Sequence, residues 1–112
     1  MRKNKVYVFK QNNTAGFFII NDRISPRVYI TAKNAKDANI KAESIGIYFD
    51  GVKDGSDCIC CGDRWTRVSE CDVVDTIPAS DYDFSWCDYV MFYDENMKSQ
   101  KIYSPNKVSN NG

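Results

Sequence analysis

One helix pattern limits the architecture of this chain more than any other feature of its sequence. Four apolar residues recur at helical spacing and form one narrow face: Ala35, Ala38, Ala42 and Ile45. Asn34 is placed to cap the start of this helix, with Asp37 three residues on, and Gly46 follows where a glycine commonly ends a helix. The spacing predicts a helix over residues 35–45, and its small face favours close packing on a sheet.

The other segments with a clear pattern are rich in β-branched and aromatic residues, which predicts strands. They are residues 5–10, 17–20, 27–32, 65–69, 89–93 and 101–103, with 47–49 as a short strand or a helix extension. Residues 50–62 form a loop rich in Gly, Asp and Cys, and a loop of this length inside a domain is usually functional or disordered. We therefore expect a single α+β domain over residues 1–103, with a small antiparallel sheet of about four to six strands packed on the one main helix. Residues 104–112 are polar and are expected to form a C-terminal tail.

Composition excludes several classes of function. The 112 residues include no histidine, which excludes a Ser-His-Asp triad, a Cys-His dyad and an HExxH zinc site. Fifteen basic and fifteen acidic residues cancel, which argues against non-specific binding to nucleic acid. We expect a protein that is not an enzyme and that needs no cofactor.

The compartment is inferred from what the sequence lacks. The N-terminal apolar run covers only residues 6–9, which is shorter than a signal peptide requires, and no window is apolar enough to cross a bilayer. We expect a protein of the host cytoplasm with no membrane contact. Its five cysteines are then reduced thiols, because cytosolic proteins rarely hold disulfides.

The neutral total conceals an uneven distribution of charge. No Lys or Arg lies between Val68 and Met97, and this stretch holds eight acidic residues: Glu70, Asp72, Asp75, Asp81, Asp83, Asp88, Asp94 and Glu95. The first ten residues carry four basic ones, Arg2, Lys3, Lys5 and Lys10. The simpler interpretation is solvated faces that attract each other or a neighbouring subunit. The alternative is an acidic interaction protein that inhibits a host enzyme.

Three of the five cysteines lie within four residues, at Cys58, Cys60 and Cys61. Cys58-x-x-Cys61-Gly62 has the spacing of a zinc knuckle, so Cys58 and Cys61 are candidate ligands of a zinc-stabilised structural module. A structural zinc needs four ligands, and the chain has neither a second pair at this spacing nor a histidine. We therefore favour three reduced cysteines packed as small apolar residues under a loop.

The residues that follow the cysteines suggest binding. Arg64 offers a planar fork for a phosphate or carboxylate, and Trp65 offers a stacking face. Asn12 and Asn13 stand in a glycine-containing turn that presents amide and backbone N–H groups. The alternative is structural, with Arg64 paired to Asp57 or Asp63 and Trp65 in the core.

Three blocks of sequence resemble a family of small uncharacterised proteins of tailed bacteriophages. They are Asn12-Asn13-x-x-Gly16-Phe17, residues 42–52 (AESIGIYFDGV) and residues 55–65, which end in Asp57-Cys58-x-Cys60-Cys61-Gly62-Asp63-Arg64-Trp65. The family pattern has glycine where this chain has Ala15. The resemblance implies an accessory protein made in the bacterial cytoplasm that acts against the host. By analogy, unrelated phage sponge proteins oligomerise and sequester the nucleotide signals of antiviral immunity.

Together these observations predict a non-enzymatic phage accessory protein that binds a small anionic, nucleotide-like ligand for counter-defence. The ligand would lie between the turn 11–16 and the loop 50–65, enclosed by a homo-oligomer. Arg64 would pair with phosphate, Trp65 or Tyr48 would stack, and Asn12, Asn13 and Asp57 would orient the ligand. The full set of candidate ligand-binding residues is Gln11, Asn12, Asn13, Tyr48, Asp50, Asp57, Asp63, Arg64 and Trp65.

Overall fold

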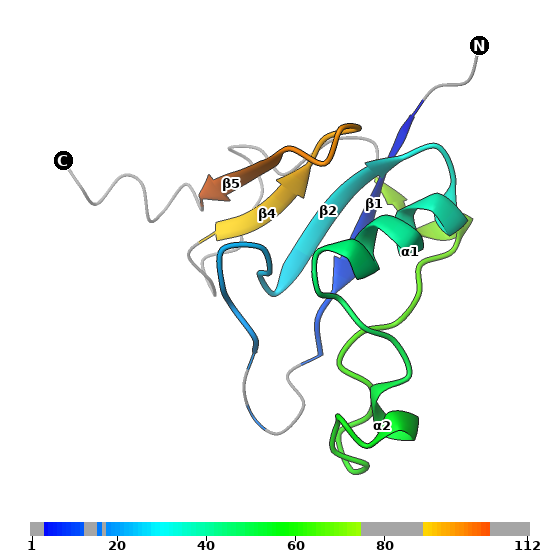
Figure 1. The fold of residues 1–112 in the computed structure, drawn as a ribbon, viewed down its shortest axis with the longest axis vertical. Helices are drawn as coiled ribbons and strands as arrows, with labels where there is room; N and C mark the ends of the chain where they lie inside the picture. The colour runs from blue at the N-terminus through cyan, green and yellow to red at the C-terminus, as the bar shows by residue number, and fades with distance from the viewer. Residues whose placement is uncertain (1–3, 13–15, 17, 75–88, 104–112) are drawn as a thin grey trace, which may run out of the picture.

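The computed structural model describes residues 4–12, 16, 18–74 and 89–103 (Figure 1). The elements, in chain order, are β1 (Lys5–Lys10), β2 (Arg27–Ala32), α1 (Ala35–Ser44), α2 (Gly51–Asp54), the 3-10 turn η2 (Glu70–Asp72), β3 (Val73–Val74), β4 (Tyr89–Tyr93) and β5 (Ser99–Tyr103). This is the predicted small α+β fold, with five strands and one main helix. The predicted tail over 104–112 lies outside the described residues.

The strands form one mixed sheet in the order β3-β1-β2-β4-β5. β1 pairs with β2 and with β3 in antiparallel fashion, and β4 pairs with β5 in the same way. β2 and β4, however, run parallel, with Val28 opposite Met91, so the prediction of a wholly antiparallel sheet is wrong at this pair. A parallel pair needs a long crossover connection. Here α1 and the segment after it connect the end of β2 to the start of β4, which lies beside the start of β2.

The helix is confirmed, with its ends close to where the sequence placed them. The Asn34 side chain accepts a hydrogen bond from the Asp37 backbone N–H at 2.8 Å, which satisfies a donor at the first turn. Gly46 has a φ of 108°, the left-handed conformation that ends a helix at little cost only for glycine. The predicted apolar face of α1 is buried against the sheet, and Ala38 and Ala42 are fully inaccessible. Figure 1 shows α1 lying across β1 and β2.

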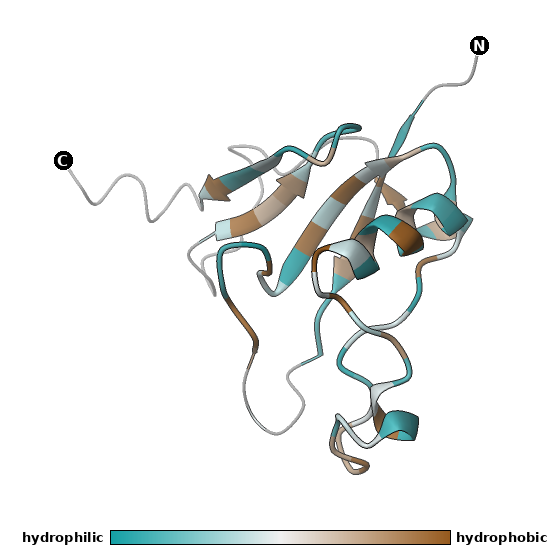
Figure 2. Ribbon diagram, viewed as in Figure 1, coloured by the Kyte–Doolittle hydropathy of each residue, from teal (hydrophilic) through white to brown (hydrophobic). Residues whose placement is uncertain are grey.

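Side chains of the strands alternate between two clusters, as the pleat requires. Tyr7, Phe9, Val28 and Ile30 face α1 in the main core, together with Trp65. Val8, Tyr29 and Val90 form a smaller cluster on the opposite face. Figure 2 shows the resulting apolar bands along β2 and β4 and on one side of α1. Among the described residues, no helix is long and apolar enough to cross a membrane.

The buried Ser25 joins β2 to β4 at the end of the parallel pair. Its hydroxyl donates to the backbone carbonyl of Arg27 and accepts from the backbone N–H of Met91, the latter at 2.8 Å. Ser25 itself is inaccessible to solvent. One side chain thus continues the contact between the two strands beyond their backbone ladder.

Two predicted strands are not strands in the structure, and side-chain amides explain both. Residues 18–20 of the predicted strand 17–20 are irregular, because Ile19 bonds the Gln11 side chain through both its N–H and its carbonyl, at 2.6 and 3.1 Å; Phe17 lies outside the described residues. Residues 65–69 are irregular as well. Asn39 of α1 bonds the N–H and carbonyl of Val68 at 2.9 and 3.1 Å, as a neighbouring strand would. Residues 47–49 are irregular, and the predicted loop 50–62 contains the short helix α2.

Within the described residues, the basic N-terminal segment forms one ion pair with the acidic stretch 68–97. Lys5 of β1 lies 4.0 Å from Glu70, in a pair that is half exposed on both sides. This contact agrees with the interpretation that the basic and acidic segments attract each other. Four of the eight acidic residues of this stretch, Asp75, Asp81, Asp83 and Asp88, fall outside the described residues.

Candidate functional site

Three polar residues of the segment that follows α1, Tyr48, Asp57 and Arg64, form a buried cluster. The Asp57 carboxylate is fully buried and accepts from the Tyr48 hydroxyl at 2.7 Å and from the Arg64 backbone N–H at 2.7 Å. The Arg64 guanidinium, only 4% exposed, donates through Nε to the Tyr48 hydroxyl at 3.1 Å and lies 3.9 Å from the carboxylate. Burial and the hydrogen bond to Asp57 raise the pKa of Tyr48. The cluster is therefore a buried ion pair with a shared hydroxyl.

Gln11 connects this cluster to the turn after β1. Its Oε1 accepts from Arg64 Nη1 at 3.0 Å as well as from Ile19, and its Nε2 donates to the carbonyls of Ile19 and Ser25. All four hydrogen-bonding capacities of this amide are therefore used, which explains how it can be 92% buried. Gln11 thus fastens the chain just after β1 to Arg64, and the predicted ligand between the turn 11–16 and the loop 50–65 stays a prediction.

Gly51 is required at its position for reasons of space. A Cβ added there would lie 1.9 Å from Asp57 Oδ2 and 2.8 Å from the Tyr48 ring. The absence of a side chain therefore lets the start of α2 approach the buried carboxylate. Asp63 supports the same helix, because its Oδ1 accepts from the Val52 N–H at 2.9 Å. The Asn12 side chain and backbone both bond residues 61–64, at 2.8 Å to the carbonyls of Cys61 and Arg64.

The remaining candidate residues have different positions. Trp65 is 2% exposed and belongs to the main core, and Arg64 pairs with Asp57, so the structural alternative for both describes their places in the fold. Asp50, with a φ of 59°, pairs with Arg67 at 3.0 Å on the surface. Asn13 lies outside the described residues. The binding roles of these side chains stay predictions.

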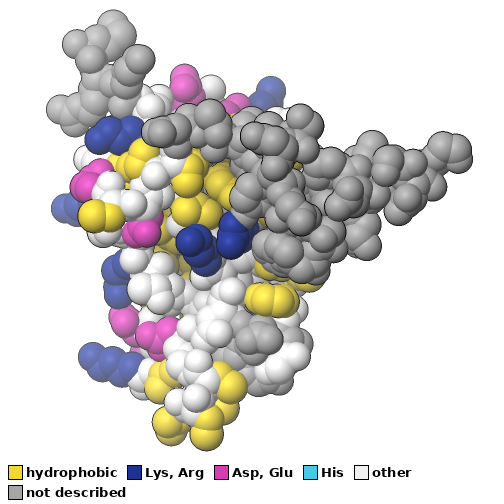
Figure 3. Space-filling view, turned by 180° about the vertical axis from the view of Figure 1, so that it is seen from behind, with side chains coloured by type: hydrophobic (Ala, Val, Ile, Leu, Met, Phe, Trp, Pro, Cys, Tyr) yellow, Lys and Arg dark blue, Asp and Glu magenta, His cyan; other side chains and the backbone are white. Residues whose placement is uncertain are grey.

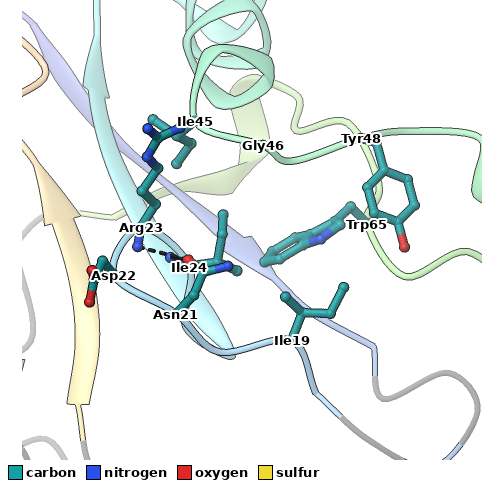
Figure 4. Close-up of a pocket in the computed structure, with 9 residues that line it drawn as sticks. All are labelled: Ile19, Asn21, Asp22, Arg23, Ile24, Ile45, Gly46, Tyr48 and Trp65. Atoms are coloured by element: carbon teal, nitrogen blue, oxygen red, sulfur yellow. Dashed lines mark hydrogen bonds between the residues drawn. The ribbon is translucent and has the colours of Figure 1, made fainter.

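A pocket of about 440 Å³ opens beside this cluster (Figure 4). One wall comes from the segment before β2 and consists of Ile19, Asn21, Asp22, Arg23 and Ile24. The opposite wall consists of Ile45, Gly46, Tyr48 and Trp65. In Figure 4 the Trp65 ring lies between Tyr48 and Ile24, and the Arg23 side chain extends toward Ile45. The pocket thus joins an apolar floor to polar groups on one side.

Arg23 is the residue that sequence reasoning missed. It is exposed, and within the part of the chain that the structure describes no carboxylate lies within ion-pair distance of its guanidinium. The Asn21 side chain holds the local turn by accepting from the N–H groups of Arg23 and Ile24 at 2.8 and 3.0 Å. The Tyr93 hydroxyl anchors the same turn through the Arg23 carbonyl at 2.7 Å. Only the Asn-Asp-Arg turn sequence hinted at this, and such turns are common.

The cysteines are not packed under the loop, so that expectation is wrong. Cys60 and Cys61 are exposed, Cys58 is intermediate, and Cys71 is exposed in η2. The backbone N–H groups of Cys61 and Cys60 donate toward the Cys58 sulfur and lower the pKa of that thiol. Among the described residues, no three metal-ligating side chains converge on one point.

The fold and these contacts define a small α+β protein with a loop fastened by buried polar side chains. The chain belongs to the family described as Domain of unknown function (DUF7296), whose profile matches residues 4–110. Neither the curated proteins nor the solved structures include a significant match to the chain.

Proposed function

We propose that this protein is a non-enzymatic binding protein for a small anionic ligand that carries a planar ring, as a nucleotide does. The observation that carries the proposal is the Arg23 guanidinium at a pocket whose other wall is aromatic. Among the described residues no carboxylate pairs with this guanidinium, so its donors can bind a phosphate. This moves the phosphate contact to Arg23 from Arg64, because the Arg64 side chain is 4% exposed and bonds Tyr48 and Gln11.

The pocket fits such a ligand in size and in lining. Its volume of about 440 Å³ falls within the usual range for small-molecule sites, roughly 300–1,000 Å³. The half-buried Tyr48 ring offers a face to a base, while Ile19, Ile24 and Trp65 give an apolar floor. Asn21 and Asp22 add polar groups for ribose hydroxyls or exocyclic amines.

The resemblance to phage proteins suggests the biological setting for this proposal. In an infected bacterium, a binding protein without catalysis would act by sequestration, and the ligand would be an immune signalling nucleotide. A homo-oligomer would close the open side of the pocket.

The test is a thermal-shift and calorimetry panel of cyclic dinucleotides, cyclic trinucleotides and cyclic ADP-ribose isomers, with inorganic phosphate as a comparison. We expect saturable binding of at least one nucleotide, with stabilisation of about 2.7 kcal/mol at a ligand concentration of 100 Kd. Arg23→Ala should weaken it at least about tenfold, the loss of one charge-assisted contact. Arg67→Ala is the matched control, because Arg67 is an exposed guanidinium outside this pocket. Silence of the whole panel, or equal binding by the Arg23 variant, would overturn the proposal.

A further inference from the structure

The feature with the least explanation in the fold is the thiol tip, residues 58–62. It protrudes next to α2 at the end of the molecule farthest from the sheet (Figure 1). Ile59 is 83% exposed, and Cys60 and Cys61 are exposed beside it. The space-filling view shows side chains of the yellow class, which includes Ile and Cys, gathered at this end (Figure 3). Cysteine is among the most buried residue types in proteins, so exposed thiols beside an exposed isoleucine need a reason.

The backbone of the thiol tip is folded in the manner of a metal-binding turn. The N–H groups of Cys61 and Gly62 donate to the Cys58 carbonyl at 3.2 and 3.0 Å, which closes the turn. Gly62 has a φ of 90°, a conformation that other residues adopt only at a cost. This closed turn keeps Cys58 and Cys61 within one tight loop and leaves both thiols at least partly accessible to solvent.

The turn is also held in place before any metal binds. The Asn12 side chain bonds the Cys61 carbonyl at 2.8 Å and the Asp63 carbonyl at 3.3 Å. Behind it, Asp63 caps α2, and the Arg64 N–H bonds the buried Asp57. A turn fixed by these contacts loses little further freedom when its thiols take a ligand.

The number of ligands decides what such a turn can hold. Structural zinc takes four ligands in tetrahedral geometry, and a Cys-x-x-Cys turn supplies two. The described residues offer no third ligand at the tip, and Cys71 is distant, because the neighbouring Glu70 bonds the N–H of Ala35 at the other end of α1. Two more ligands must therefore come from outside this part of the chain.

We propose that two copies of this protein meet tip to tip and share one zinc ion, each copy contributing Cys58 and Cys61. A two-fold axis through the metal makes the contact self-complementary, as in most homodimers. It also places each exposed Ile59 at the contact, where its apolar surface is covered. The site is independent of the pocket beside Arg23.

The test uses the full chain, purified under reducing conditions and stripped of metal, and then titrated with Zn²⁺ or with Co²⁺ as a spectroscopic probe. We expect saturation at one metal per two chains, a doubling of the mass in native mass spectrometry, and the thiolate-to-cobalt absorption of a tetrathiolate site. Cys58→Ser and Cys61→Ser should each abolish the absorption and the mass change. Cys60→Ser and Cys71→Ser are matched controls and should keep both.

Other outcomes would overturn the proposal. Cys87 lies outside the described residues, so Cys87→Ser separates a shared site from one within a single chain. Two results contradict sharing between copies. One is metal bound at one per chain with the protein still monomeric, and the other is metal bound only while Cys87 is present. Absence of metal binding at micromolar Zn²⁺, with circular dichroism showing a folded chain, contradicts the site itself.

Discussion

The sheet and the loop region that follows α1 are stabilised in opposite ways. β1 and β2 pair over six residues each, so backbone groups satisfy one another. From Ile45 to Ser69, regular structure is limited to α2. In this region buried side chains satisfy the hydrogen bonds of the backbone. Asn39 of α1 replaces a strand for Val68, Gln11 accepts a hydrogen bond from Arg64, and Arg64 pairs with the buried Asp57. A sheet tolerates changes in most single side chains, whereas such a loop depends on a few of them.

The largest expected effect in this comparison comes from Arg64→Ala. It leaves the fully buried Asp57 carboxylate without its guanidinium, and breaking a buried pair from one side costs about 3–5 kcal/mol. Urea unfolding followed by circular dichroism measures the loss. Arg67→Ala, which removes a half-exposed pair with Asp50, should cost less than about 1 kcal/mol.

A double variant sharpens this prediction. Arg64→Met combined with Asp57→Asn removes both charges, so it should be more stable than Arg64→Ala, because no charge is left unpaired. Equal losses for Arg64→Ala and Arg67→Ala would show that the buried cluster does not stabilise the loop.

The next effect comes from the two amides that replace strands. Gln11→Ala and Asn39→Ala should each cost about 1–3 kcal/mol, because each leaves partly buried backbone groups without partners. The Gln11 change should be the larger, since that amide makes four bonds and one of them is to Arg64.

Hydrogen exchange locates these losses. The Ile19 amide should lose protection in Gln11→Ala, and the Val68 amide should lose it in Asn39→Ala, while central amides of β1 and β2 keep theirs in both. Unchanged exchange at Ile19 and Val68 would mean that backbone or water contacts hold these segments.

The smallest effect, visible mainly through pH, tests a bond between the two regions. The Tyr7 hydroxyl of β1 donates to Glu70 at 2.6 Å, and Glu70 also accepts from the Ala35 N–H at 2.8 Å. Burial, with Glu70 nearby, raises the pKa of Tyr7 to about 12 from its ordinary 10.0. The hydrogen bonds from Tyr7 and Ala35 lower the pKa of Glu70.

These directions fix the sign of the pH dependence. The contribution of Tyr7 is complete below its ordinary pKa and is lost as the pH rises toward 12, because the unfolded chain releases the proton first. The contribution of Glu70 is present above its ordinary pKa and is lost as the pH falls through its lowered value. Tyr7→Phe should therefore make the urea midpoint of unfolding depend less on pH, both at the acidic and at the alkaline end of a scan from about pH 3 to about pH 11. Tyr103→Phe on the exposed edge strand is the control, and identical profiles for both variants would contradict the assignment.

The sequence predicted the parts of this structure that depend on local pattern. Helix spacing, the Asn34 cap and Gly46 gave α1, and β-branched runs gave β1, β2 and β4, because these signals are contained within a few residues. Residues 17–20 and 65–69 carry the same local signal. Ile19 and Val68 are bonded by the side chains of Gln11 and Asn39 and not by strands, and strand propensity does not report such side-chain contacts.

The candidate site likewise has a part that the sequence predicted and a part that depends on the rest of the fold. Gln11, Tyr48, Asp57 and Arg64 were grouped from sequence, and they do converge, although on one another rather than on an open surface. The pocket wall at Arg23 could not be predicted, because a common turn sequence reveals nothing about the cavity that the fold places beside it.

The buried Ser25 hydroxyl has a consequence for which face of β4 meets the helix. A slip of one residue against β2 would exchange Met91, in the main core, with Val90, in the smaller cluster on the opposite face. The hydrogen bond from the Met91 N–H to Ser25 exists in only one of these two alignments. The Ser25 side chain therefore helps to fix the register of the parallel pair. This register decides which residues of β4 pack in the main core and which pack in the smaller cluster.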